Sequence, residues 1–155
     1  MRTPGKIYWL PLALLLSVVL AGPALAAKKG DPHPAGLREQ AAIARTVELY
    51  IEGGRQGSSK IMRQAFHEGA NIYANVNGQV LGGPIQALYD LVDGKPPAGN
   101  IDYELASVEY AANIATVRLE IANWAGAHYT DMFTLLKIGE EWKIISKVSY
   151  VHPKQ

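Results

Sequence analysis

The chain has 155 residues, with 15 lysines and arginines against 14 aspartates and glutamates, and this length suits one domain with a modest core. It contains no cysteine, which excludes disulfides, thiolate chemistry and cysteine-ligated metals. No basic arm or stripe breaks the charge balance, so we expect no nucleic-acid partner.

The first 26 residues have the pattern of a secretory signal peptide. Arg2 and Lys6 precede the apolar run Ile7–Leu20, which is short for a membrane span. Ala24-Leu25-Ala26 then supplies the small residues that signal peptidase recognises. We expect cleavage after Ala26 and an exported product, periplasmic by default, without membrane attachment; a retained N-terminal anchor is the alternative.

Residues 27–36 are rich in proline and glycine and predict a flexible leader before a domain at residues 37–155. Helical spacing of apolar residues then predicts three helices, over Leu37–Glu52, over a short segment from Ser58 or Ser59 to Phe66, and over Pro84–Val92. Gly53-Gly54 is expected to end the first helix, and His67-Glu68-Gly69 the second.

Strand-forming residues and tight turns make up most of the remaining chain. Asn77-Gly78 is a strong hairpin signal between two short strands, Ala70–Val76 and Gln79–Leu81. Four longer strands follow as a meander, over Ile101–Tyr110, Ile114–Trp124, His128–Ile138 and Trp142–Val151. This order predicts an α+β fold, with three N-terminal helices packed on a curved antiparallel sheet.

Three phrases of the sequence carry a family resemblance: VELYIEGG, AFHEGANIY and TDMFTLLKIGEEWKIISKV. With the element order, they resemble the nuclear-transport-factor-2-like (NTF2-like, also SnoaL-like) superfamily over roughly Ala41 to Tyr150. Within it, the chain is most similar to the "putative lumazine-binding" family. The resemblance implies a cone-shaped, cystatin-like fold around a pocket and a homodimer formed through the convex face of the sheet. It does not specify lumazine as the ligand.

The same superfamily includes ketosteroid isomerase, and that comparison implies roles for three residues. Tyr50 falls at the position of the oxyanion-hole tyrosine, and Asp131 at that of the neutral, hydrogen-bond-donating aspartic acid. Ala74 falls at the position of the catalytic base. Because alanine cannot accept a proton, the comparison argues against isomerase chemistry.

Asp131 also stands out on physical grounds, since an unpaired carboxylate within an apolar strand is costly. In one interpretation it lies in an apolar cavity, has a raised proton affinity and donates to a ligand oxygen. In the other it accepts bonds from Tyr50, a backbone amide or Lys147 and holds the sheet in place. Tyr50 is open to the same two interpretations, as a ligand donor or a core residue.

The histidines are weaker candidates. His67 is a possible general base, with a capping or structural role as the alternative. His128 has the opposite strand parity to Asp131 and should face the other side of the sheet, and His152 lies in the tail. No HxH, HxxxH or ExxH spacing occurs, so we expect no metal. Nucleotide-binding loops and a nucleophile elbow are absent from the sequence, so we expect no cofactor.

Aromatic side chains are numerous enough to wall a pocket, although each one can equally be a core residue. Tyr129, Asp131 and Phe133 share one parity of the predicted strand, which should be the pocket side. The predicted ligand-binding residues are Tyr73, Tyr89, Trp124, Tyr129 and Phe133.

Three functions remain open from the sequence. The first is binding of a small hydrophobic or aromatic molecule without turnover, which the missing base at Ala74 favours. The second is a cofactor-free lyase, isomerase or cyclase that uses Asp131, Tyr50 and His67. It requires Asp131 and His67 to face one cavity. The third is a structural or interaction role with the cone filled by side chains.

Overall fold

The computed structural model describes residues 34–76 and 78–153. The expected signal peptide, most of the expected leader and Asn77 lie outside these residues. Of the helices within the described ranges, none is long and apolar enough to cross a membrane.

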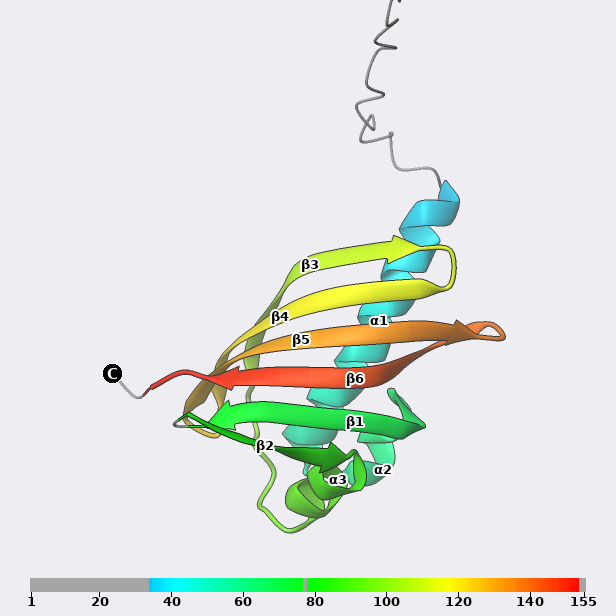
Figure 1. Ribbon diagram of the computed structural model, residues 1–155. Helices are drawn as coiled ribbons and strands as arrows, with labels where there is room; N and C mark the ends of the chain where they lie inside the picture. Colours follow the sequence, from blue (N-terminus) through cyan, green and yellow to red (C-terminus); the bar gives the residue numbers. More distant parts are fainter. Residues whose placement is uncertain (1–33, 77, 154–155) are drawn as a thin grey trace, which may run out of the picture. The chain divides into compact units, whose positions relative to one another are not determined.

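Helices and strands follow in the predicted order (Figure 1). The helices of the described chain are α1 (Pro34–Gln56), α2 (Ser59–Met62) and α3 (Gln86–Asp93). The strands are β1 (Phe66–Val76), β2 (Gln79–Pro84), β3 (Asp102–Ala111), β4 (Ile114–Trp124), β5 (Ala127–Ile138) and β6 (Glu141–Val151).

The strands form one curved sheet in the order β2-β1-β6-β5-β4-β3. All neighbouring pairs are antiparallel except β1 and β6, which run parallel. Helix α1 crosses one face of this sheet, and α2 and α3 lie near its β1–β2 end (Figure 1). The predicted α+β fold class is thereby confirmed. We call the face that packs on α1 the concave face and the opposite one the convex face.

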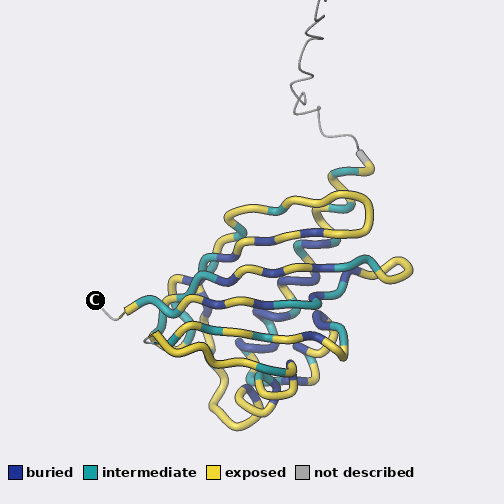
Figure 2. Tube along the Cα trace, viewed as in Figure 1, coloured by how far each residue is buried: buried dark blue, intermediate teal, exposed yellow. Residues whose placement is uncertain are grey.

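Alternating burial along the strands determines which side chains form the core (Figure 2). In β4, Ala115, Val117, Leu119 and Ile121 are at most 3% exposed, while the residues between them are exposed or half-buried. They pack with apolar residues of α1, α3 and β5 in one cluster. The alternation is the expected pattern for an antiparallel sheet with one face covered.

The first helix differs from the prediction at both ends. It begins at Pro34, so its first turn takes in the last residues of the predicted leader, and it continues through Gly53-Gly54 to Gln56. Both positions require glycine because neighbouring side chains lie too close for a Cβ atom. A Cβ on Gly53 would lie 2.6 Å from Met62 Cβ, and one on Gly54 would lie 2.1 Å from Trp124 Cζ2. The helix ends instead before Gly57, whose φ of +60° is a common helix terminator.

Two further boundaries differ at the β1–β2 hairpin. Strand β1 begins at Phe66, so His67 is a strand residue rather than the end of a helix. Strand β2 continues to Pro84, and α3 begins at Gln86 rather than at the proline. The hairpin itself is present, since Val76 pairs with Gln79 and Gly78 has a φ of +82°.

Candidate functional site

A cavity of about 560 Å³ opens on the concave side of the sheet. Its walls come from the C-terminal half of α1, from α3 and the loop after it, and from the ends of β1, β4, β5 and β6. Most of the lining is apolar, including Leu88, Leu91 and Trp124. The volume lies in the range of small-molecule sites.

The polar part of the lining is built around one buried acid. Asp131, in β5, is 0% exposed and accepts hydrogen bonds from Tyr50 Oη at 2.9 Å, Lys147 Nζ at 2.9 Å and Ser149 Oγ at 2.5 Å. Lys147 also donates to Ser149. Tyr50, Lys147 and Ser149 line the cavity, whereas Asp131 is not among its lining residues. Asp131 therefore holds in place the three side chains that a ligand would meet.

The two tyrosines at this end of the cavity remain protonated. Burial, followed by the nearby Asp131 carboxylate, raises the pKa of Tyr50 well above its ordinary value. The same two causes raise the pKa of Tyr129, which also lines the cavity. At neutral pH, both phenols are thus hydrogen-bond donors rather than bases.

Lys147 and Ser149 face the cavity because β6 contains a bulge. From Ile138↔Glu141 to Leu135↔Ile144 the partners follow one register, but Thr134 then pairs with Ser146, which leaves Ile145 as an extra residue. One extra residue exchanges the two faces of a strand. Consequently Trp142 and Ile144 point inward before the bulge, and Lys147 and Ser149 point inward after it.

Several predicted site residues come together at this cavity. Tyr50, Tyr73, Trp124 and Tyr129 all line it, and Trp124 lies against the Tyr50 ring with centroids 5.0 Å apart. Tyr73 remains 46% exposed. For Asp131, the structure supplies two of the three partners that the second interpretation named, Tyr50 and Lys147.

Other predicted residues are placed elsewhere. Tyr89 and Phe133 are in the core, at 3% and 2% exposure, because their rings pack edge-on against Phe66 and Tyr50. His67 is half-buried on β1, and its Nδ1 accepts a bond from the amide of Gly69. Neither His67 nor Asp131 is among the lining residues, so the structure does not bring this pair to a common ligand position in the described chain.

Ala74 lies in the cavity wall and presents a methyl group to it. The position that the isomerase comparison assigns to the base therefore faces the cavity without a proton acceptor. Lys147 and Ser149 are the functional candidates that sequence reasoning did not assign to ligand binding. Their signal is an inward lysine and serine beside an inward acid, and it is visible only once the β6 bulge is known.

A second group of polar side chains lies on the convex face. Glu120, His128 and His152 bring possible metal-ligand atoms within 4.8 Å of one another. These residues do not form a short metal-ligand motif in the sequence. The register of the sheet brings them together.

Comparison with known proteins shows the family to which the chain belongs. Residues 38–150 match the model of the family described as "Putative lumazine-binding". A protein named aldolase FrzH, from Cladobotryum sp, is 32% identical over 117 residues, which cover 75% of this chain and 94% of that protein.

Solved structures agree with the fold. An NTF2-like protein of unknown function from Shewanella baltica OS155 is 33% identical and has a TM-score of 0.72, covering 76% of this chain and 97% of that one. An NTF2-like protein from Methylobacillus flagellatus KT is 28% identical, has a TM-score of 0.71 and covers 76% and 94% of the two chains. A ketosteroid isomerase-like protein from Erwinia carotovora atroseptica shares the fold alone, at 16% identity and a TM-score of 0.58, covering 75% and 98%. The chain therefore belongs to the "putative lumazine-binding" family of the NTF2-like superfamily.

Proposed function

We propose that this protein binds a small, largely apolar or aromatic molecule in the concave cavity. The observation that carries this proposal is the cavity itself: about 560 Å³, mostly apolar, with polar side chains that include Tyr50, Lys147 and Ser149. A structural role with a filled cone does not account for this open volume.

The polar end favours a ligand with a carbonyl or an anionic group. An ammonium has three donors, and Asp131 and Ser149 engage two of those of Lys147. Within the described part of the chain the third has no hydrogen-bond acceptor, so it can meet a ligand oxygen. Trp124 and the leucines of α3 would contact the apolar body of the ligand.

The dye 8-anilinonaphthalene-1-sulfonate combines fused aromatic rings with an anionic group and tests this pocket directly. We expect the folded protein to bind the dye with enhanced dye fluorescence. Ala74→Phe places a phenyl ring in the volume of the cavity and should abolish this binding. Ala111→Phe is the matched control, because Ala111 is exposed at the end of β3 and does not line the cavity.

Lys147→Met should weaken dye binding while the apolar wall is kept. Dye binding that survives Ala74→Phe would contradict the proposal, provided that the variant unfolds with the same cooperativity as the wild type. That control is needed because the dye also binds partly folded states.

A second function, carbon–carbon bond chemistry, is favoured by one observation: Lys147 places an amine in the cavity wall of a chain 32% identical to a protein named as an aldolase. In this account, Lys147 Nζ gives up its proton to Asp131 and attacks a substrate carbonyl carbon. Loss of the carbonyl oxygen as water then leaves an imine. The step needs no cofactor.

Borohydride trapping distinguishes turnover of this kind from binding alone. The protein is incubated with a small aldehyde or ketone and sodium borohydride, and the modified peptide is identified by mass spectrometry. A secondary amine at Lys147, absent in Lys147→Met, would support the imine. Labelling confined to exposed lysines outside the cavity, such as Lys60, would refute it while leaving the binding proposal intact.

The proposal extends to export and assembly. The pattern of residues 1–26 supports export to the periplasm with cleavage after Ala26, and N-terminal sequencing of the protein from its host should begin at Ala27. On the convex face, Met132, Val148 and Tyr150 are about half exposed on the adjacent central strands β5 and β6. This apolar patch supports a homodimer in which the same face of two chains meets.

A further inference from the structure

A compact cluster of histidine and glutamate side chains lies on the convex face, separate from the cavity. Glu120 comes from β4, His128 from β5, and His152 directly follows β6. One possible ligand atom from each residue lies within 4.8 Å of those of the other two. The ligand-binding function proposed above does not use these residues.

The sheet register builds this cluster. His152 N donates to His128 O at 2.9 Å, which extends the β5–β6 ladder by one pair beyond Tyr129↔Val151 and places the two histidines directly opposite. Glu120 pairs with Thr130, the same-face neighbour of His128. Without the bulge at Ile145, His128 would instead lie opposite Val151.

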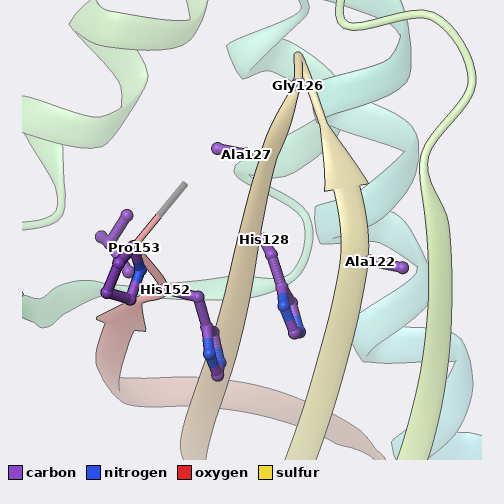
Figure 3. A pocket seen from close by; sticks show the side chains of 7 residues that line it. Ala122, Gly126, Ala127, His128, His152 and Pro153 are labelled. Carbon is purple, nitrogen blue, oxygen red and sulfur yellow. The ribbon is translucent and has the colours of Figure 1, made fainter. Parts of the chain in front are cut away.

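The two imidazoles lie face to face, with centroids 3.8 Å apart and planes 7° from parallel. Figure 3 shows both rings extending in the same direction, His128 from β5 and His152 from the segment just after β6; both residues line a surface hollow. Tyr150 packs edge-on against the His152 ring at 4.8 Å and restricts its orientation. The nitrogen atoms of the two rings are thus presented together at the surface of the single chain.

The glutamate is oriented toward the histidines by its other contacts. Arg118 occupies Glu120 Oε1 through Nε at 2.7 Å, and the other oxygen, Oε2, accepts a bond from Thr130 Oγ1 at 2.7 Å. Oε2 lies 4.0 Å from His128 Nε2, and Thr130 Oγ1 lies 2.9 Å from His152 Nε2. Thr130 therefore links the carboxylate and His152 and holds them on one side of the cluster.

Two imidazoles and one carboxylate are a ligand set that zinc uses, with a fourth position left for water or another molecule. Zinc–ligand bonds of about 2.0–2.2 Å require ligand atoms to approach one another to roughly 3.3 Å in a tetrahedral site. The present separations, all within 4.8 Å, exceed this by at most about 1.5 Å. His128 is 47% exposed at its side chain, so rotation of its ring can close this gap without disturbing the core.

We propose that Glu120, His128 and His152 form a site for a divalent transition metal, best suited to Zn²⁺, on the convex face at the end of β6. The neighbouring Arg118 guanidinium offsets the negative charge of Glu120 and should keep the affinity moderate. Co²⁺, Ni²⁺ and Cu²⁺ suit the same nitrogen and oxygen ligands.

The test is calorimetric titration of the untagged protein with zinc chloride, supported by the visible spectrum of the Co²⁺ form. The wild type should bind one zinc per chain, and Co²⁺ should give the intense visible bands of a four-coordinate site. His152→Ala and Glu120→Gln should each weaken zinc binding roughly tenfold or more. His67→Ala is the matched control, at a histidine outside the cluster, and should leave zinc affinity unchanged.

Folding is checked without metal. His128 and His152 lie at the surface, so we expect His128→Ala and His152→Ala to unfold at nearly the wild-type temperature, and only the wild type to be stabilised by added zinc. Zinc affinity that is equal in the wild type and in the His128→Ala/His152→Ala double variant would overturn the proposal. So would a stoichiometry of one zinc per two chains, because a single chain would then not form the site.

Discussion

The buried pair of Lys147 and Asp131 offers a quantitative test of how the cavity is held together. Asp131 is 0% exposed and Lys147 is 7% exposed, and their charged atoms are 2.9 Å apart. Lys147→Met keeps most of the apolar stem of the side chain but removes the ammonium. Tyr50 and Ser149 would then be the only side chains, among those described, that donate to the carboxylate.

Breaking a buried ion pair from one side costs about 3–5 kcal/mol, because the remaining charge is left without compensation. We therefore expect Lys147→Met to lower the free energy of unfolding by about 3–4 kcal/mol, or the melting temperature by roughly 10–20 °C for a domain of this size. Asp131→Asn should cost about 2–3 kcal/mol. The double variant removes both charges and should cost about as much as the worse single variant, giving a coupling free energy of about 2–3 kcal/mol.

The assay is urea unfolding of the three variants, followed by circular dichroism. Lys143→Met is the matched control: Lys143 is on the same strand, but its ammonium contacts the exposed Glu141 and a backbone carbonyl, so the loss should stay below about 1 kcal/mol. Strict additivity of Lys147→Met and Asp131→Asn, or a Lys147→Met loss no larger than that of Lys143→Met, would refute the reasoning.

Three further predictions concern the surroundings of the site. Gly54→Ala places a Cβ 2.1 Å from Trp124 Cζ2, so the indole must move at a cost of about 1–3 kcal/mol; unchanged urea unfolding and near-ultraviolet dichroism would contradict this contact. The hydrogen bond from Lys137, followed by that from the Trp142 indole, lowers the pKa of Glu39. The ionised Glu39 side chain therefore stabilises the fold above pH 4.5, and this stabilisation is lost as the pH falls through the lowered pKa. Glu39→Gln should therefore destabilise at pH 7 and approach the wild type in acid; a difference that does not shrink as the pH falls from 7 to 3 would oppose this. Tyr150→Glu should convert the proposed dimer to a monomer in sedimentation velocity, whereas an unchanged sedimentation coefficient would exclude this face as the interface.

Much of the sheet could be predicted because its signals are local. From the alternation of apolar residues and the tight turns between them, the bounds of the four long strands were predicted to within one residue. The end of α1 could not be predicted in the same way. Gly53-Gly54 has the composition of a terminator, but tertiary contacts with Met62 and Trp124 require glycine within the helix.

The site was predictable only in part, for a related reason. The parity of β5 correctly placed Asp131 inward and His128 outward. The bulge at Ile145 has no comparable local signature, yet it decides which face each later residue of β6 occupies. It brings Lys147 and Ser149 to the cavity and His152 to His128, so neither cluster follows from spacing in the sequence.

Native mass spectrometry of the protein purified from its own host tests the central claim most directly. The wild type should carry a small molecule of discrete mass, which release and fragmentation would identify as largely apolar or aromatic with a carbonyl or anionic group. Ala74→Phe should appear without this mass while remaining folded, and Ala111→Phe should retain it. A wild type without any bound molecule, or a bound molecule that persists in Ala74→Phe, would contradict the assignment of the concave cavity as the ligand site.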